Sequence, residues 1–204
     1  TAIQGDLKNE IDVTVKALNS LARQLNHINE QIAEVEPHGY LPNDLYDERD
    51  RLLDQMSELA NIKVTYSSSG GNSLDIAEGK ATVAFVAQDG TEYTIVDGKN
   101  LQYKKVAVTY DEAYVSELTI GGSKVTFENM TKVPIGKLSA LIEMNGFKSN
   151  GTAYGVYPEM IANLDKMAFE FANAFNEVHR EGYSLLEIDR DATYNLRFFQ
   201  GVDH

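Results

Sequence analysis

Residues 7–35 read LKNEIDVTVKALNSLARQLNHINEQIAEV, and this stretch decides the fold. Apolar or small side chains recur at alternating spacings of four and three residues, the heptad pattern of a helix that packs along one face. We call this set the apolar seam, and it consists of Leu7, Ile11, Thr14, Leu18, Leu21, Leu25, Ile28, Ile32 and Val35. The seam predicts one helix ~43 Å long at 1.5 Å per residue, packed as in a coiled coil or an elongated bundle.

Two prolines and a glycine separate this helix from a second helical segment. They are Pro37, Gly39 and Pro42. Asn43 or Asp44 is expected to cap the second helix, with Asp47 as a capping-box-like acceptor. The apolar seam continues at Leu45, Leu52, Met56 and Leu59. Because the connection is short, we expect the two helices to be antiparallel neighbours.

Arg49 falls on the seam of the second helix, between Leu45 and Leu52. A charge at such a position must be paired or lie at the end of the bundle, because burying an isolated charge is costly. We therefore expect its guanidinium to make charge-assisted hydrogen bonds with a carboxylate or with backbone carbonyl groups. Four further polar residues lie on or beside apolar helix faces: Asn26, Asn29, Asn176 and His179. Two roles stay open for them, either fixing the register between helices or serving as hydrogen-bonded polar residues at the edge of the core without partner contacts.

From Lys63 the hydrophobic period changes from helical to alternating. Short runs rich in β-branched and aromatic residues, separated by turn signals, predict a β unit of about six or seven short strands. The runs are residues 63–66, 73–76, 82–86, 93–96, 117–120 and 124–127. Gly121 and Gly122 separate the last two runs by the spacing of a tight hairpin.

The helical pattern returns after Pro134, and Pro158 is expected to open a third helix because proline suits a first helical turn. The apolar residues of this helix are Ile161, Leu164, Ala168, Phe171, Phe175 and Val178. The predicted fold class is therefore α+β. An elongated, heptad-patterned antiparallel helical bundle is expected from residues 1–62 plus 136–204, with a small all-β domain of residues 63–135 inserted.

Composition limits the function classes. The chain has 204 residues, with 18 Lys and Arg against 31 Asp and Glu, a formal net charge of −13. Such an acidic chain is a poor match for nucleic acid, and no apolar run approaches the roughly 20 residues of a membrane span. There is no cysteine, which excludes disulfides and thiolate metal sites within these residues.

No catalytic pattern stands out. The four histidines, His27, His38, His179 and His204, have no metal-ligand spacing, and the acidic residues near Asp47 alternate with Arg49 and Arg51 as on a solvated helix face. Phosphate loops, nucleophile elbows and dinucleotide fingerprints are absent from the sequence. We therefore expect no catalytic residue, cofactor or metal, and a protein that is not an enzyme.

Two stretches resemble a known family. The first is LPNDLYDERDRLLDQMSEL at residues 41–59, and the helix before it matches at residues 21–32. The second consists of Leu164, Asp165, Phe171, Ala172, Phe175, Asn176, His179, Gly182 and Tyr183, followed by Phe198 and Phe199. These stretches resemble the flagellar hook-associated protein 1 family, of the FlgK type, and cover the helical half of the chain. Residues 96–132 match this family by position only, and residues 185–191 replace its glycine-rich loop.

The resemblance implies a structural protein of the bacterial flagellum, secreted through the flagellar export apparatus and assembled outside the cell as a ring between hook and filament. It implies as partners further copies of the chain, the hook protein, the second junction protein and an export chaperone, with no nucleic acid and no membrane. The signature residues carried by the resemblance are Asn43, Asp44, Leu45, Asp47, Arg49, Asp50, Phe175, Asn176 and His179.

Two other classes remain open. One is another flagellar axial protein, flagellin-like or the second junction protein, against which the signature at residues 43–50 argues. The other is a binding protein on a coiled-coil stalk, which would need a cleft with convergent polar groups in the β unit. The chain begins at Thr1 without Met, and we expect a piece of a longer protein. Its first helix should then expose Ile3, Leu7 and Ile11, less buried than Leu25, Ile28 and Ile32, as an interface for missing helices or for another subunit.

Overall fold

The computed structural model describes residues 2–87, 89–125, 136–182 and 198–199. The chain forms two compact units, Thr1–Val156 and Tyr157–His204, and each is described by itself. The expectations for residues 126–132, Pro134, Tyr183, residues 185–191 and His204 lie outside the described residues.

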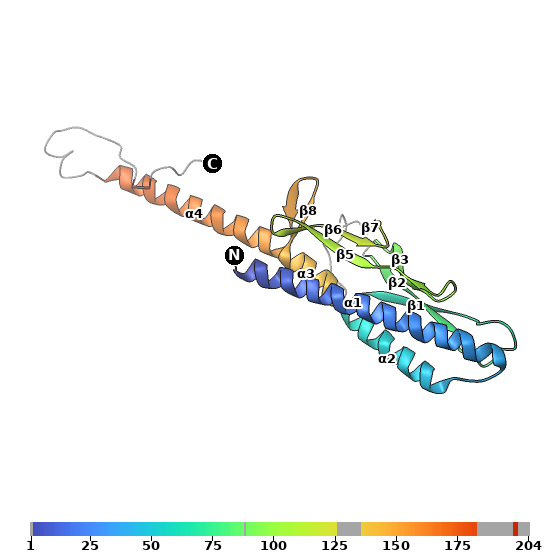
Figure 1. The fold of residues 1–204 in the computed structure, drawn as a ribbon. Coiled ribbons are helices and arrows are strands. Elements are labelled where there is room, and N and C mark those ends of the chain that lie inside the picture. Colours follow the sequence, from blue (N-terminus) through green and yellow to red (C-terminus); the bar gives the residue numbers. More distant parts are fainter. Residues whose placement is uncertain (1, 88, 126–135, 183–197, 200–204) are drawn as a thin grey trace. The chain divides into compact units, whose positions relative to one another are not determined.

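Three helices of the first unit carry the predicted seam. Helix α1 covers Ala2–Val35, a short 3₁₀ helix η1 covers Glu36–His38, α2 covers Asn43–Leu59 and α3 covers Lys137–Asn145. α2 runs back along α1, which confirms the antiparallel pair (Figure 1). The buried residues of α1 include Ile11, Leu18, Leu25 and Ile32, so the seam is confirmed as the buried face of this helix.

Helix α2 starts differently from the prediction. Pro42 takes the N-cap position and no side chain caps the helix, so the expected caps at Asn43 and Asp44 and the capping box with Asp47 are wrong. The backbone amides of Leu45 and Tyr46 instead donate to the Pro42 carbonyl. The turn before the helix thus satisfies these amides without a side-chain acceptor.

Two small sheets follow the first helices. The first contains β1 Ile62–Ser67, β2 Lys80–Val86, β3 Glu92–Asp97 and β4 Gln102–Tyr103, all antiparallel in the order β1-β2-β3-β4. The second contains β5 Val106–Asp111, β6 Tyr114–Ile120, β7 Ser123–Val125, β8 Phe147–Ser149 and β9 Thr152–Tyr154. Its order is β5-β6-β8-β9, and β7 pairs with the same strand β6. Only the single bridge between β6 and β8 is parallel among the described pairs.

The tight hairpin at Gly121 and Gly122 is confirmed. Ile120 pairs with Ser123, and both glycines have positive φ, 60° and 85°, as the twist of a two-residue hairpin requires. The strand predicted at residues 73–76 is wrong, because this stretch forms turns. Its apolar side chains Leu74 and Ile76 are exposed, so the run has no core to pack against.

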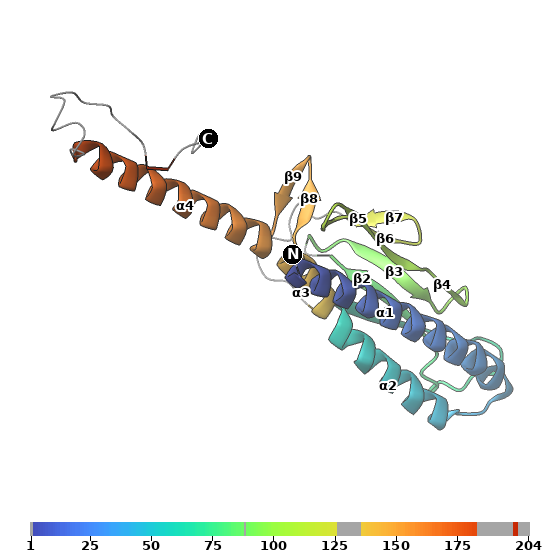
Figure 2. The ribbon, with the colours of Figure 1, turned by 60° about the vertical axis from the view of Figure 1, so that its left-hand side comes forward.

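Helices and sheets of the first unit share one hydrophobic core. Residues from α1, α2, α3 and both sheets form a single buried cluster, which includes Leu18, Met56, Phe85, Leu118 and Ile142. α1 lies along both sheets (Figure 2). The α+β class, with a helical part and an inserted β part, is confirmed. The predicted domain boundaries, at residues 62/63 and 135/136, stay a prediction. Strands β8 and β9 come after α3 in the chain, yet they belong to the second sheet.

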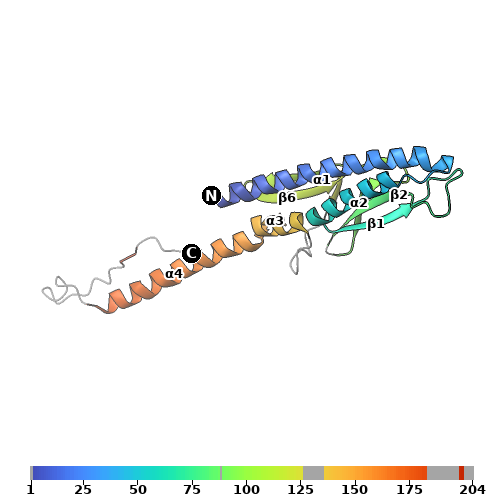
Figure 3. The ribbon, with the colours of Figure 1, turned by 90° about the horizontal axis from the view of Figure 1, so that it is seen from below.

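One expectation for the start of α1 needs correction. Ile3 is 58% exposed and Leu7 is partly buried, but Ile11 is completely buried. α3 packs along this part of α1 (Figure 3), and the Lys137 ammonium of α3 pairs with Glu10 at 2.5 Å. Ile11 is thus covered within the chain and is not available as an interface residue.

The second unit contains helix α4, Val156–Glu181. It begins two residues before Pro158, which is within the usual uncertainty of a helix boundary. Its apolar side chains Leu164, Phe171, Phe175 and Val178 are exposed, whereas Ala172 and Asn176 are buried. No helix in the described ranges is both long and apolar enough to cross a membrane.

Candidate functional site

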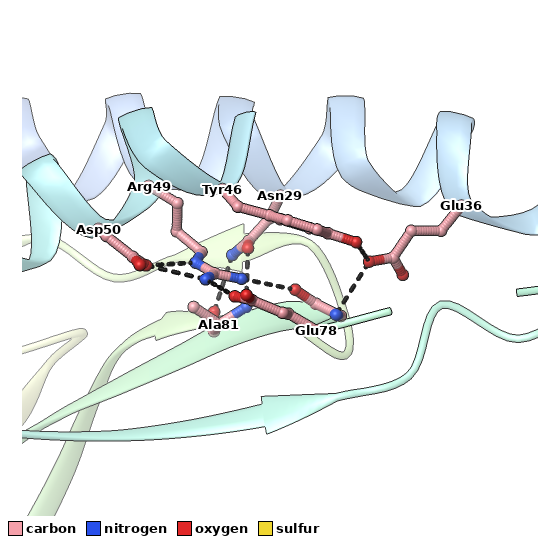
Figure 4. Close-up of polar contacts among 8 residues, drawn as sticks. Asn29, Glu36, Tyr46, Arg49, Asp50, Glu78 and Ala81 are labelled. Carbon is pink, nitrogen blue, oxygen red and sulfur yellow. Dashed lines mark hydrogen bonds and ion pairs between the residues drawn. The ribbon is translucent and has the colours of Figure 1, made fainter. Parts of the chain in front are cut away.

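Arg49 is the centre of a buried polar network between α2 and the segment before β2. Its side chain is 1% exposed. Nε and one terminal nitrogen donate to Asp50 Oδ1 at 2.9 and 2.8 Å, and the other terminal nitrogen donates to the Gly79 carbonyl at 3.2 Å. Glu78 is the second carboxylate partner (Figure 4). The expected charge-assisted bonds of Arg49 to carboxylates and a backbone carbonyl are confirmed.

Aromatic rings and carboxylates keep this cation charged. The guanidinium carbon lies 5.0 Å from the ring centre of Tyr46 and 4.7 Å from that of Tyr66. Burial alone would lower the pKa of Arg49, but the hydrogen bonds with Glu78 and Asp50 outweigh burial, and the pKa lies above its ordinary value. The pKa of Tyr66 is also raised, mainly by burial. The carboxylates of Asp50 and Glu78 remain partly solvated, so only the charge of Arg49 is removed from water in this network.

Gly79 is held from two sides. Its carbonyl accepts from Arg49, and its amide donates to Glu36 Oε1 at 2.9 Å. The same Glu36 oxygen accepts from the Tyr46 hydroxyl at 2.5 Å. Burial and the bond to Glu36 raise the pKa of Tyr46 to about 12. The 3₁₀ helix η1, the start of α2 and the entry to β2 are therefore joined at one backbone position.

Gly79 is also the residue that this backbone position requires. Its φ is +78°, and a Cβ there would lie 2.3 Å from the Ser67 carbonyl oxygen. A side chain would collide with the backbone of the strand β1 that precedes it. The network thus depends on a glycine that lets the chain pass close to β1.

Two asparagines of α1 bind the backbone of the two sheets. Asn29 is completely buried; its amide nitrogen donates to the Ala81 carbonyl and its oxygen accepts from the Ala81 amide, both at 2.8 Å. Asn19 makes the same pair of bonds with Val106, again both at 2.8 Å. We call these contacts the Asn29 clamp and the Asn19 clamp. One fixes β2 of the first sheet and the other fixes β5 of the second sheet against the same helix.

A third clamp lies in the second unit. Asn176 is 4% exposed; its nitrogen donates to the Phe199 carbonyl at 3.0 Å and its oxygen accepts from the Phe199 amide at 2.9 Å. The rings of Phe171, Phe175, His179 and Phe198 surround this contact, with centre separations of 5.0–6.5 Å. The signature residues Phe175, Asn176 and His179 therefore act together to hold Phe198 and Phe199 on α4.

The structure separates the signature residues into these two units. Arg49 and Asp50 share the first network, whereas Asn43, Asp44 and Asp47 are exposed and Leu45 is half-buried. Asn26 donates to Glu30 at 2.8 Å on the same helix, so it does not bridge elements there as Asn29 does. Sequence reasoning missed Asn19, Glu36, Glu78 and Gly79. Glu36 gives no pattern signal because it lies in the helix break, and Gly79 has the same sequence context as a loop glycine.

These contacts position backbone segments, and they leave few donor or acceptor atoms of these side chains free to bind a substrate. The side-chain amide of each clamp asparagine uses both its nitrogen and its oxygen in hydrogen bonds. The Arg49 guanidinium is occupied by Asp50, Glu78, the Gly79 carbonyl and the two tyrosine rings. In the part of the chain that the structure describes, no group of three or more His, Asp or Glu side chains could hold a metal ion. What the arrangement does is fix helices on sheets.

Comparisons with known proteins agree with this architecture. The family described as "Flagellar hook-associated protein FlgK helical domain" matches residues 1–194. A relative from Bacillus subtilis, "Flagellar hook-associated protein 1", is 46% identical over 186 residues, covering 89% of this chain and 36% of the relative. Proteins of the same name from Salmonella typhimurium and Escherichia coli are 26% and 23% identical, covering 93% and 85% of this chain.

The chain spans about a third of the length of these relatives, between 28% and 36%. The match nevertheless includes the first unit with its Arg49 network, and helix α4 with Asn176, whereas the partner of that asparagine, Phe199, lies beyond the matched residues. The chain belongs to the flagellar hook-associated protein FlgK family.

Proposed function

We propose that the protein carrying this chain is a non-enzymatic structural component of the bacterial flagellum, assembled as a ring at the junction between hook and filament. The observation that carries the proposal is the family match over residues 1–194. Its proposed partners are further copies of itself, the hook protein, the second junction protein and, before export, a chaperone. It would act outside the cell after passage through the flagellar export apparatus.

The first unit has the mechanical properties that a junction needs. A subunit between two rotating tubes must transmit load without slipping between its own layers. The Asn29 and Asn19 clamps tie both sheets to α1 at positions ten residues apart, or ~15 Å along the helix. The Arg49 network ties α2 to the entry of β2. These directional contacts favour a single arrangement of helices and sheets, in support of a structural role.

The second unit has a surface suited to assembly. The exposed side chains of α4 include Leu164, Phe171 and Val178. Apolar side chains at helical spacing in such numbers favour a covered state. In the assembled flagellum they would be covered by other segments of the full-length protein or by neighbouring subunits.

A complementation experiment tests the proposed role. The gene of the full-length protein is deleted in its source organism, and cells are examined for motility and, by electron microscopy, for hooks and filaments. We expect intact hooks without attached filaments, and recovery of both filaments and motility when the full-length gene is restored. Normal filaments in the deletion strain would contradict the proposal. Loss of the hooks themselves would indicate an earlier axial component instead.

A further inference from the structure

A basic groove lies between α1 and β4. Two adjoining open hollows, of about 390 and 430 Å³, share Arg23 of α1 and Tyr103 of β4 in their walls. Lys16 and Lys105 line the larger hollow. We call this surface the α1/β4 groove. It presents three cations and an aromatic ring over a stretch of helix that runs from Lys16 to Glu30.

The cations of the groove have no acidic partner within the described residues. The three side chains are exposed and form no ion pair there, although acidic residues outnumber basic ones in the chain by 31 to 18. Nearby carboxylates on α1 have other partners: Asp12 accepts from Tyr110 at 2.8 Å, and Glu30, which lines the smaller hollow, accepts from Asn26 at 2.8 Å and lies 3.4 Å from His27. A cluster of free cations on a strongly acidic protein favours an acidic partner.

An acidic stripe of matching size lies on α2. At helical spacing, four exposed carboxylates fall along one face, those of Asp44, Asp47, Asp54 and Glu58. Arg51 lies on the same face but is held by Glu48 through bonds of 2.8 and 2.5 Å, so it neutralises none of the four. We call these four residues the α2 stripe. None of them has an ion pair in the described part of the chain.

The spacings of the two surfaces agree. Lys16 and Arg23 are seven residues apart, as are Asp47 and Asp54, which places each pair ~10 Å apart along its helix. Two helices can therefore lie side by side with Lys16 and Arg23 of one opposite Asp47 and Asp54 of the other.

The two surfaces lie at opposite edges of one sheet. β1 and β4 are the outer strands of the first sheet. α2 lies at the β1 edge, where Arg49 contacts the Tyr66 ring, and the groove includes Tyr103 at the β4 edge. Figure 2 shows α1 between α2 and β4. One subunit can thus use its groove and its stripe at the same time, the head-to-tail arrangement that closes into rings.

We infer that the α1/β4 groove of one subunit binds the α2 stripe of a second copy of this chain, and that this contact joins neighbouring subunits. The inference rests on the proposed function, because a ring at the junction needs a lateral contact between copies. It goes further by naming the two surfaces and the partner. Because the contact pairs opposite charges on exposed side chains, its affinity should fall as salt screens those charges.

Charge reversal in the full-length protein tests the contact. The groove variant carries Lys16→Glu and Arg23→Glu, the stripe variant carries Asp47→Lys and Asp54→Lys, and a combined variant carries all four. Lys99→Glu with Lys124→Glu is the matched control, because both lysines are exposed and lie outside the groove, the stripe and α4. Lys124 gives up only its pair with Glu117, and the change in net charge equals that of the groove variant. The readout is the amount of protein retained on isolated hooks, by quantitative immunoblot after washes of rising ionic strength. Protein in the medium shows that each variant is exported.

We expect the groove and stripe variants each to be retained roughly tenfold less than wild type, since like charges would face each other. The combined variant should recover to within about threefold, because the reversed charges again attract, and the control should match wild type. Retention of either single-surface variant at the wild-type level would overturn the inference, as would a combined variant that fails to recover. Absence of the wild-type protein from hooks is a separate outcome, which overturns the proposed function itself.

Discussion

Asn29 and Ala81 exchange two hydrogen bonds of 2.8 Å, and so hold the first residues of β2 against the buried face of α1. Just before Ala81 in the chain, Gly79 is held by Glu36 and Arg49. Three side chains, one each from α1, η1 and α2, thus fix Gly79 and Ala81 at the entry to the first sheet. Through this short segment, the helices are hydrogen-bonded to the first sheet.

Replacing Arg49 by alanine should lower the free energy of unfolding by about 2 to 4 kcal/mol. The buried guanidinium fills the space between Tyr46 and Tyr66, and its loss leaves the Gly79 carbonyl without this donor. Urea denaturation checks the change. Arg51→Ala is the matched control, because Arg51 is two residues away in an exposed pair with Glu48 and should leave the midpoint unchanged. Coinciding midpoints for wild type and Arg49→Ala would show that the network does not stabilise the fold.

Replacing Asn29 by alanine should expose the Ala81 amide to hydrogen exchange. The Asn29 oxygen is its acceptor, and removal of a buried bidentate partner costs about 2 to 3 kcal/mol. Residue-resolved exchange measured by NMR checks this, with Val106 as an internal reference because its amide is held by Asn19. In Asn19→Ala the pattern should be reversed. Equal acceleration of both amides in each variant would mean global destabilisation and would contradict local clamping.

Gly79→Ala should destabilise the protein more than Gly90→Ala. Both glycines have positive φ, +78° and +83°, so both substitutions incur about 1 kcal/mol of backbone strain. Only at Gly79 would the added Cβ meet backbone, 2.3 Å from the Ser67 oxygen, whereas nothing lies within 4 Å at Gly90. Thermal unfolding midpoints of the two variants give the comparison. Equal midpoints would mean that β1 moves away without cost.

The stability contribution of Tyr46 should depend on pH in the alkaline range. Its pKa is raised from 10.0 to about 12, so the folded state holds the proton more tightly than the unfolded state does. This contribution is therefore complete below pH 10 and is lost as the pH rises from 10 to about 12. Tyr46→Phe should be less stable than wild type at neutral pH, because it leaves Glu36 without the hydroxyl donor.

The difference between wild type and Tyr46→Phe should then shrink across that interval, as urea midpoints at a series of pH values would show. Other groups that titrate there are common to both proteins and cancel in the difference. A difference that stays constant from neutral pH to pH 12 would contradict the assignment of the raised pKa to Tyr46.

Helices α1 and α2 could be predicted because the pattern that specifies each of them lies within its own stretch of sequence. A seam at heptad spacing predicts both α1 and α2, and a charge on that seam predicts a partner for Arg49. The predicted carboxylate partner was correct in kind, but Glu78 could not be named. It lies 29 residues further along the chain, and only the folded path of residues 68–79 brings it to Arg49.

The remaining features depend on tertiary contacts that leave no periodic signal. Asn19 is not one of the predicted seam residues, and its role depends on where β5 begins. Residues 73–76 have strand composition but lack a neighbouring strand, so they form turns. Ile11 was expected to be exposed at a cut helix end, yet α3 returns to cover it after the β region. In each case a distant segment decides the outcome.

The most direct test of the account is the position of the full-length protein on the flagellum. An epitope inserted at Gly90, which lies in a turn with open space around it, provides a label that leaves both surfaces of the proposed contact intact. Immunogold electron microscopy of intact flagella then locates the protein. The account predicts gold particles confined to the boundary between hook and filament. Label distributed along the filament, or absent from flagella whose filaments are complete, would contradict it.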